Sequence, residues 1–209
     1  MVTILYLIRH GETAGGGTKR YKGSLDEPLS GRGVAQIREA SAFIAKKAEL
    51  SAVYCSGLSR ALKSAEIIAE PYGLKPVIID DLRERSFGLW EGMTFDEIKE
   101  LYPAEFEAWA SNPLTHSPVN GENTLEVYDR TIRALDLIIN KHNASGGHSG
   151  TDSIAIVAHG GVNRIILCHL MGVPLENFFR IEQDYAAVNI IEFWERYPVI
   201  KLLNGGPVG

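Results

Sequence analysis

The sequence Ile4-Leu5-Tyr6-Leu7-Ile8-Arg9-His10-Gly11 is a run of five apolar residues followed by an arginine, a histidine and a glycine. A continuous apolar run of this length predicts a strand that is buried on both faces of a sheet. The later sequence Ile154-Ala155-Ile156-Val157-Ala158-His159-Gly160 has the same pattern, again with histidine and glycine after the run. Ligands of open α/β sheets bind beyond the carboxyl ends of the strands. The two runs therefore predict an α/β protein with two histidines at a binding edge.

Helices and strands alternate along the rest of the chain. Apolar residues three and four positions apart predict an amphipathic helix through Val34, Ile37, Ser41, Ile44 and Ala48, and a longer one after Asn123 through Leu125, Tyr128, Ile132, Leu135 and Ile139. Strands are expected at 52–55, 77–79, 188–194 and 199–203, and helices at 58–70, from 94 to Pro103, and at 161–171. Capping boxes are expected at Thr94 and Asn123. This order predicts a three-layer α/β/α fold with a mostly parallel central sheet.

Composition narrows the class of protein. The chain has 209 residues, of which 45% are hydrophobic and 22% charged, values typical of a globular protein. We expect one domain over 1–209 with a lid insertion at about 92–122. The net charge of −5 argues against nucleic acid as a partner, and no apolar run is long enough to span a membrane. Two cysteines and the absence of a basic, signal-like N-terminal flank predict a cytoplasmic location.

Four motifs follow one another in the chain. They are Leu7-Ile8-Arg9-His10-Gly11-Glu12-Thr13, Tyr54-Cys55-Ser56-Gly57-Leu58-Ser59-Arg60-Ala61, Leu82-Arg83-Glu84-Arg85-Ser86-Phe87-Gly88-Leu89-Trp90-Glu91-Gly92 and Ala158-His159-Gly160-Gly161-Val162. In this order and at these separations the chain resembles the histidine phosphatase superfamily, the phosphoglycerate mutase-like proteins, over nearly its whole length. The resemblance implies the phosphoglycerate mutase-like fold.

The resemblance also implies roles for individual residues. His10 is the expected nucleophile and Glu84 the general acid, while His159 is the second catalytic histidine. Arg9, Arg60 and Gly160 are expected to bind phosphate. The residue types fit this chemistry, because guanidinium groups grip phosphate and a neutral imidazole can attack phosphorus. The residues alone do not distinguish His10 from His159 as the nucleophile, and Glu84 alone is equally compatible with an ordinary surface carboxylate. The expected mechanism requires no metal and no cofactor.

The loop after the first strand is expected to contact the substrate. Thr13, Arg20, Lys22 and Arg85 are the candidate substrate-binding residues, and Lys19, Arg20 and Lys22 form a basic rim that would attract an anion. Simple solvation of Lys19 and Lys22 explains them equally well. Many relatives have an asparagine where this chain has Gly16, so one phosphate contact is in doubt and the Gly-rich loop is expected to be mobile.

Other interpretations fit the sequence less well. Cys55 and Arg60 are separated by four residues, whereas cysteine phosphatases need five, so Cys55 is expected to be a small buried apolar residue. Gly15-Gly16-Gly17-Thr18-Lys19 lacks the Gly-Lys-Ser/Thr ending of a nucleotide-binding loop. His142 and His148 are expected to be solvated. A non-enzymatic binding module would lack one of the catalytic residues, and the sequence contains all of them.

The predicted lid indicates the type of substrate. Residues 100–129 contain no Lys or Arg and six acidic residues, which disfavours a second strong negative charge on the substrate. Arg20 and Arg85 could still hold a carboxylate, and Tyr102, Phe106 and Trp109 could cover a neutral or ring-bearing leaving group or pack the lid onto the domain. We therefore predict a phosphatase that acts on a small phosphorylated metabolite and resembles the α-ribazole phosphatase-like and phosphoserine phosphatase-like branches. The alternative is a phosphoglycerate mutase. A homodimer is compatible with the sequence.

Overall fold

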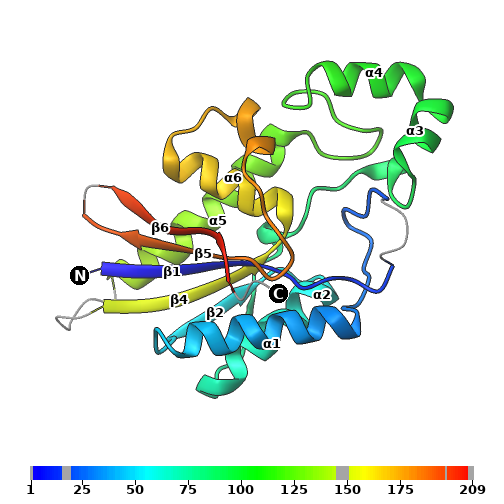
Figure 1. Cartoon of the computed structure of the whole chain (residues 1–209). Coiled ribbons are helices and arrows are strands. Elements are labelled where there is room, and N and C mark those ends of the chain that lie inside the picture. The colour runs from blue at the N-terminus through cyan, green and yellow to red at the C-terminus, as the bar shows by residue number, and fades with distance from the viewer. Residues whose placement is uncertain (1, 16–19, 145–150, 196, 207–209) are drawn as a thin grey trace.

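Six strands form one sheet, and the larger helices lie on its two faces (Figure 1). The structure, a computed structural model, describes every residue except 1, 16–19, 145–150, 196 and 207–209. The strands are β1 (Val2–Arg9), β2 (Ala52–Cys55), β3 (Val77–Ile78), β4 (Thr151–Ala158), β5 (Val188–Phe193) and β6 (Pro198–Gly205). The helices are α1 (Gly31–Ala45), α2 (Ser59–Ala69), α3 (Phe95–Leu101), α4 (Pro103–Ser111), α5 (Thr124–Ala144) and α6 (Gly160–Met171).

The strand order is β3-β2-β4-β1-β5-β6. The pairs from β3 to β1 are parallel, whereas β5 is antiparallel to both of its neighbours, so the mostly parallel sheet expected from the sequence is confirmed. Strands β1 and β4 are aligned along their whole length, ending with Arg9 opposite Ala158. Because His10 and His159 are the next residues of the two strands, the register brings them to the same point of the sheet edge.

Alternate residues of the central strands are buried under different helix pairs. Leu5, Leu7, Ile154 and Ile156 belong to a core cluster with residues of α5 and α6. The residues between them, such as Tyr6 and Ile8, pack with α1 and α2 on the opposite face. This alternation explains the continuous apolar runs of β1 and β4, since both faces of each strand need apolar side chains. The three-layer α/β/α prediction is confirmed.

The buried face of α5 differs from the predicted stripe. Leu125 is 42% exposed, whereas Val127 is fully buried against the sheet-side core. Ile132, Leu135 and Ile139 are buried as expected. The helix begins at the predicted capping box, in which Asn123 and Glu126 exchange hydrogen bonds of 2.8 and 2.9 Å. The prediction failed at Leu125 because the buried face of the first turn is formed by Thr124 and Val127, so Leu125 points to the other side.

The segment expected to be a lid contains α3 and α4, which lie away from the sheet in Figure 1. The predicted capping box at Thr94 starts α3, and Pro103 starts α4 after a one-residue break. A separate apolar cluster holds this segment together, with Trp90, Ile98 and Phe106 buried and Tyr102 and Trp109 packed against them. Most of the lid aromatics therefore have a structural role. The extent of the domain and the movement of a lid stay predictions.

His142 corrects one expectation. Its side chain is 8% exposed and lies between the hydroxyl of Tyr54, at 2.9 Å, and the carboxylate of Asp152, at 2.6 Å. It was expected to be solvated because it precedes a Gly-rich segment, but it lies on the last turns of α5 that still face the sheet. His148 lies outside the described residues. No helix in the described part of the chain combines the length and the apolar character needed to cross a membrane.

Candidate active site

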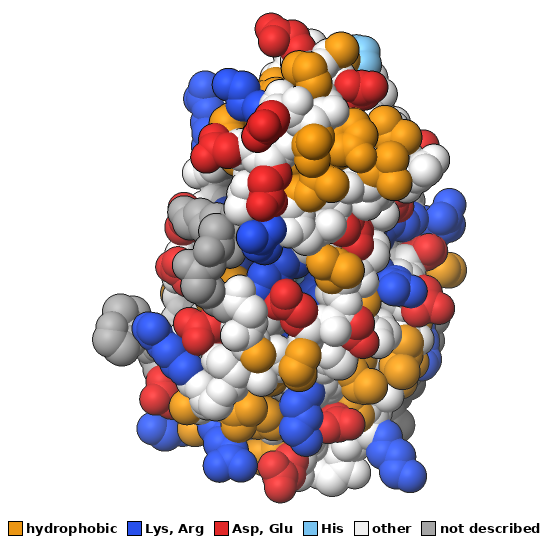
Figure 2. Space-filling view, turned by 90° about the vertical axis from the view of Figure 1, so that its right-hand side faces the viewer, with side chains coloured by type: hydrophobic (Ala, Val, Ile, Leu, Met, Phe, Trp, Pro, Cys, Tyr) orange, Lys and Arg blue, Asp and Glu red, His pale blue; other side chains and the backbone are white. Residues whose placement is uncertain are grey.

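Two histidine rings meet where β1 and β4 end. The ring centroids of His10 and His159 are 5.1 Å apart, and the rings are inclined at 61°. This edge of the sheet faces the right-hand side of Figure 1, which is the face drawn in Figure 2. Lys and Arg side chains gather near the middle of that face, and hydrophobic side chains form a patch above them (Figure 2). The parallel register of the two strands thus assembles residues that are about three-quarters of the chain apart.

His10 is held as a neutral base. Its Nδ1 lies 2.7 Å from the carbonyl oxygen of Gly11, which can only accept, so Nδ1 carries the proton and donates. Burial, together with the positive charges of Arg9 and Arg60, holds the pKa of His10 well below its ordinary value of 6.5. The neutral ring therefore presents the lone pair of its Nε2, which is what a nucleophilic imidazole requires.

His159 is fully buried beside it. Its Nε2 lies 2.7 Å from the hydroxyl oxygen of Ser56, and its Nδ1 has no hydrogen-bond partner although it is buried. Burial, the proximity of a second titratable ring in His10, and the positive charges of Arg60 and Arg9 hold the pKa of His159 well below its ordinary value. A buried polar atom without a partner is costly. The vacant Nδ1 is therefore a place where a bound ligand would complete the hydrogen bonding.

Two guanidinium groups flank the histidines. Arg9 donates to the carbonyl of Gln183 at 2.5 Å and lies 4.0 Å from the centre of the Tyr185 ring, while its Nε is buried without a partner. Arg60 donates to the carbonyls of Leu25 and Gly23, at 2.6 and 2.7 Å. These carbonyls fix both groups in place without neutralising them. An anion between the two arginines would meet two positive charges that are already oriented.

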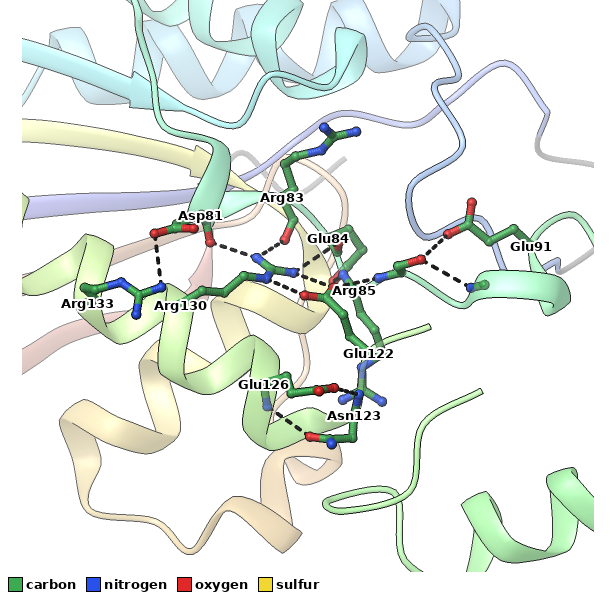
Figure 3. Close-up of polar contacts among 12 residues, drawn as sticks. Asp81, Arg83, Glu84, Arg85, Glu91, Glu122, Asn123, Glu126, Arg130 and Arg133 are labelled. Carbon is green, nitrogen blue, oxygen red and sulfur yellow. Dashed lines mark hydrogen bonds and ion pairs between the residues drawn. The ribbon is translucent and has the colours of Figure 1, made fainter. Parts of the chain in front are cut away.

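Glu84 lines the same cavity as His10, Arg9 and Arg60. Its two carboxylate oxygens accept from the backbone N–H groups of Arg85 and Gly161, both at 3.0 Å. The loop that carries Glu84 is held by Arg130, whose guanidinium donates to the carbonyls of Asp81, Arg83 and Glu84 (Figure 3). Glu122 completes this network through two hydrogen bonds to Arg130. Glu84 is therefore a positioned carboxylate and not a free surface side chain.

Two adjoining cavities open at this edge. The first, which we call the histidine cavity, has a volume of about 510 Å³ and is lined by His10, Arg9, Arg60, Glu84 and Tyr185, among others. The second, the aromatic cavity, has a volume of about 220 Å³ and is lined by aromatic side chains together with Arg85 and Arg164. Tyr21, Glu84 and Phe87 line both cavities. Glu84 therefore lies at the junction between a basic compartment and an apolar one.

The predicted substrate-binding residues divide between these cavities. Thr13, Arg20 and Lys22 line the histidine cavity, but each is already bonded to the protein. Lys22 donates to Thr13 at 2.9 Å and to Glu27 at 2.5 Å, and Arg20 donates to Gly92 and Glu97 at 2.6 and 2.9 Å. Arg85 lines the aromatic cavity only. Gly16 and Lys19 lie outside the described residues, and so does the predicted mobility around Gly16.

Two further residues of the motifs, Gly160 and Trp90, lie beside Arg9 and in the lid cluster. Gly160 does not line the histidine cavity but begins α6 beside Arg9, where a Cβ atom would be 3.4 Å from Arg9 Nε. Trp90, in the same motif as Glu84, is fully buried in the lid cluster. Phe87 packs against that cluster and supplies an apolar wall beside Glu84.

Sequence reasoning missed Ser56 and Tyr185. Ser56 lies inside the second motif, and its contact with His159 depends on the pairing of β2 with β4. Tyr185 lies in the loop before β5 and covers both Arg9 and His10, whose ring is 5.7 Å from its own. No motif marks Tyr185 in the sequence. Among the described residues, no group of three or more His, Cys, Asp or Glu side chains is arranged to hold a metal ion.

Comparison with known proteins places this site in a family. The model of the histidine phosphatase superfamily (branch 1) matches residues 5–205. The chain is 32% identical to phosphoserine phosphatase 1 of Hydrogenobacter thermophilus, over 96% of this chain and 91% of that protein. It is 26% identical to adenosylcobalamin/alpha-ribazole phosphatase of Escherichia coli, over 98% and 97% of the two chains.

A solved structure gives the same result. The alpha-ribazole phosphatase of Shigella flexneri superimposes with a TM-score of 0.86 at 27% identity, covering 97% of this chain and 96% of that one. The relatives are named as phosphatases, and the fold matches over the whole chain. The chain is a phosphatase hydrolase, and it belongs to branch 1 of the histidine phosphatase superfamily.

Proposed function

We propose that this phosphatase hydrolyses a small phosphomonoester in two steps through a phosphohistidine on His10. One observation carries the proposal. Two neutral, buried imidazoles lie between two oriented guanidinium groups, and two buried polar atoms there, Arg9 Nε and His159 Nδ1, have no partner. A phosphoryl group is a dianion with several acceptor oxygens, so it would supply the missing partners of both atoms.

The first step transfers the phosphoryl group to the enzyme. His10 Nε2 attacks phosphorus, a P–N bond forms, and the bond from phosphorus to the alcohol oxygen breaks. Glu84, with its carboxyl protonated, gives its proton to the departing oxygen. Arg9, Arg60 and the Nδ1–H of His159 hold the three equatorial oxygens, where negative charge gathers in the transition state. The position of Glu84 at the junction of the two cavities suits this role, because the bridging oxygen lies between phosphate and alcohol.

The second step returns the enzyme to its first state. The Glu84 carboxylate takes a proton from a water molecule, whose oxygen attacks phosphorus as the P–N bond to His10 breaks. The products are inorganic phosphate, a neutral His10 and a protonated Glu84. The same carboxyl therefore acts first as acid and then as base, which requires only one well-placed group.

Phosphatase action fits this chain better than mutase action. A mutase must retain its alcohol while the enzyme is phosphorylated, whereas a phosphatase releases the alcohol and admits water. Residues 100–129 contain no Lys or Arg to retain a multiply charged alcohol, and Arg20 is engaged by Glu97. The names of the relatives suggest phosphoserine and α-ribazole phosphate as the first substrates to test. A cytoplasmic location and a homodimer stay predictions.

Trapping the intermediate tests the proposal. The enzyme is mixed briefly with a ³²P-labelled phosphomonoester, quenched in alkali and digested. We expect acid-labile label on the peptide that contains His10, and no label with His10→Ala. Absence of label during active turnover, or label on a peptide that lacks His10, would overturn the proposed intermediate. Transfer of phosphate between phosphoglycerate positions without release of inorganic phosphate would favour the mutase instead.

A further inference from the structure

The aromatic cavity is a compartment for a ring. Its walls include the side chains of Tyr21, Phe87, Trp109, Phe178 and Phe179. Tyr21 meets Phe87 edge to face at 4.9 Å between centroids, and Phe178 lies 4.0 Å from Phe179. A volume of about 220 Å³ is small for a ligand pocket and suits one ring with a substituent. The lid α4 supplies Trp109 and the turn after α6 supplies the two adjacent phenylalanines.

A buried cation faces this apolar space. Arg85 is 5% exposed, and its guanidinium lies 5.9 Å from the ring centres of both Phe87 and Phe178. Its side chain donates one hydrogen bond, to the hydroxyl of Thr124, which in turn donates to the carbonyl of Pro113. In the described part of the chain no carboxylate lies within 4.0 Å of this guanidinium. Burial lowers the pKa of Arg85, and the charges of Glu84 and Glu122 oppose that effect without forming a direct ion pair, so the guanidinium can still take an anion at contact distance.

A second polar group in the same cavity also lacks a partner. The indole Nε1 of Trp109 is buried and makes no hydrogen bond, although the ring lines the cavity. An indole N–H can only donate, as can the guanidinium of Arg85. The Trp109 N–H has no acceptor, and the guanidinium of Arg85, bonded to Thr124, can donate further hydrogen bonds but cannot accept one from the indole. An occupant with acceptor oxygens would complete them.

Glu84 connects this cavity to the reaction. It lines both cavities, and the proposed proton transfer places the alcohol oxygen of the substrate beside its carboxyl. With the phosphoryl group between Arg9 and Arg60, the rest of the alcohol extends past Glu84 into the aromatic cavity. Figure 3 shows Arg85 extending from the Glu84 loop toward the start of α5, away from Arg83. Arg85 is thus on the alcohol side of the junction.

We propose that the aromatic cavity selects a ring-bearing alcohol that carries a carboxylate, and that Arg85 is the residue that binds this carboxylate. The proposal rests on the proposed function, since it assigns the leaving group of the same reaction. The single negative charge pairs with Arg85, the ring lies among the aromatic walls, and Trp109 donates to a free oxygen. This proposal refines the expectation drawn from the acidic lid. The enzyme accepts a substrate whose alcohol carries one carboxylate and disfavours one whose alcohol carries a second phosphate.

Wild-type enzyme and two pairs of esters provide the first test. 3-Carboxyphenyl phosphate is compared with 3-(hydroxymethyl)phenyl phosphate, because neither meta substituent changes the acidity of the phenol much. We expect kcat/KM to be about tenfold or more higher for the carboxylate ester, as for a buried hydrogen bond to a charged group. 2-Cyclohexylethyl phosphate should likewise exceed ethyl phosphate, which has no ring to bury. Equal values within either pair would overturn the inference, whereas failure to hydrolyse any ester would contradict the proposed function itself.

The variant Arg85→Gln provides the second test. We expect the ratio of kcat/KM for the charged over the neutral aryl ester to fall to about one, because the carboxylate loses its cation. Arg83→Gln removes the same charge two residues away from an exposed side chain and is the matched control. It should keep the wild-type ratio. A preference retained by Arg85→Gln, or lost equally in both variants, would contradict the role of Arg85. If Arg85→Gln does not fold, the wild-type comparison decides the question.

Discussion

The hydroxyl oxygen of Ser56 lies 2.7 Å from Nε2 of His159, and both side chains are fully buried. The same oxygen lies 3.4 Å from the backbone N–H of Leu58, from which it can only accept. The oxygen could accept a second bond, but in the described part of the chain its proton has no acceptor other than His159 Nε2, so we infer that Ser56 donates to Nε2 and that the imidazole proton is on Nδ1. This is the nitrogen without a partner, so the tautomer set by Ser56 points an N–H toward the phosphoryl site.

Removing the Ser56 hydroxyl should therefore impair catalysis through His159. For Ser56→Ala we expect kcat to fall roughly tenfold, the effect of about one buried hydrogen bond. ¹⁵N NMR of the histidines should show His159 leaving the Nδ1–H tautomer, and Ser56→Thr should restore it. A purely structural role would lower stability and leave the tautomer unchanged, and that result would contradict this prediction.

Glu84→Gln should separate substrates by their leaving groups. An amide cannot give up a proton, so alkyl phosphates should lose about 10²–10⁴-fold in kcat/KM. An activated aryl phosphate, whose phenolate leaves without a proton, should lose much less in the first step. Pre-steady-state measurement of alcohol release isolates that step. Equal losses for the two kinds of ester would indicate that Glu84 positions the substrate and does not protonate it.

Gly161 should tolerate no side chain. A Cβ atom there would lie 2.6 Å from the carboxylate of Glu84, which the N–H of Gly161 now holds at 3.0 Å. We expect Gly161→Ala to displace Glu84 and to reproduce the leaving-group dependence of Glu84→Gln. Gly172→Ala, at the other end of α6, is the matched control, because no atom lies within 4 Å of its new methyl group. The positive φ of 65° at Gly172 means that this control variant loses some stability. Wild-type kcat/KM for alkyl esters in Gly161→Ala would contradict the argument.

The sequence predicts the sheet edge where His10 and His159 meet, because a local pattern marks the ends of both β1 and β4. A continuous apolar run that ends in His-Gly is a local pattern, and parallel strands necessarily end at one edge. The contacts of Ser56 and Tyr185 depend on which strands are neighbours and on how a loop covers Arg9. No local pattern encodes those pairings. Sequence reasoning therefore predicted that His10 and His159 meet at one edge and missed Ser56 and Tyr185, which contact them there.

The division of the site into two cavities could not be predicted from the sequence either. Arg85 lies inside the third motif and Arg20 in the loop after the first, yet Arg20 is engaged by Glu97 on the surface and Arg85 is buried beside Thr124. Their difference arises from packing between the lid and α5, over long sequence separations. Leu125 shows the same limit, because the apolar pattern did not decide whether Leu125 or Val127 faces the core in the first turn of α5.

Cys55 should be chemically inert in the folded enzyme. It is fully buried in the core beneath α1 and α2, and burial, with a smaller effect of Glu66, raises its pKa to about 12. The thiolate is the reactive form, so iodoacetamide should modify Cys55 only after unfolding in urea. Peptide mass spectrometry before and after denaturation measures this. Rapid native alkylation with loss of activity would instead support a cysteine phosphatase.

The buried histidines should make the enzyme less stable in mild acid. The pKa of His10 is lowered by burial and by Arg9 and Arg60, so the folded chain keeps this ring neutral below pH 6.5, where the unfolded chain takes up a proton. Because the unfolded state then binds more protons, the free energy of unfolding falls as pH drops below about 6.5, by at most about 1.4 kcal/mol per pH unit for each such histidine. Urea unfolding between about pH 7.5 and about pH 5.5, above the range of ordinary carboxyls, measures the slope in phosphate-free buffer. His10→Asn should reduce the slope of unfolding free energy against pH by up to the equivalent of one proton. Identical slopes for wild type and variant would contradict the prediction, because they would show that His10 is already protonated in the folded enzyme.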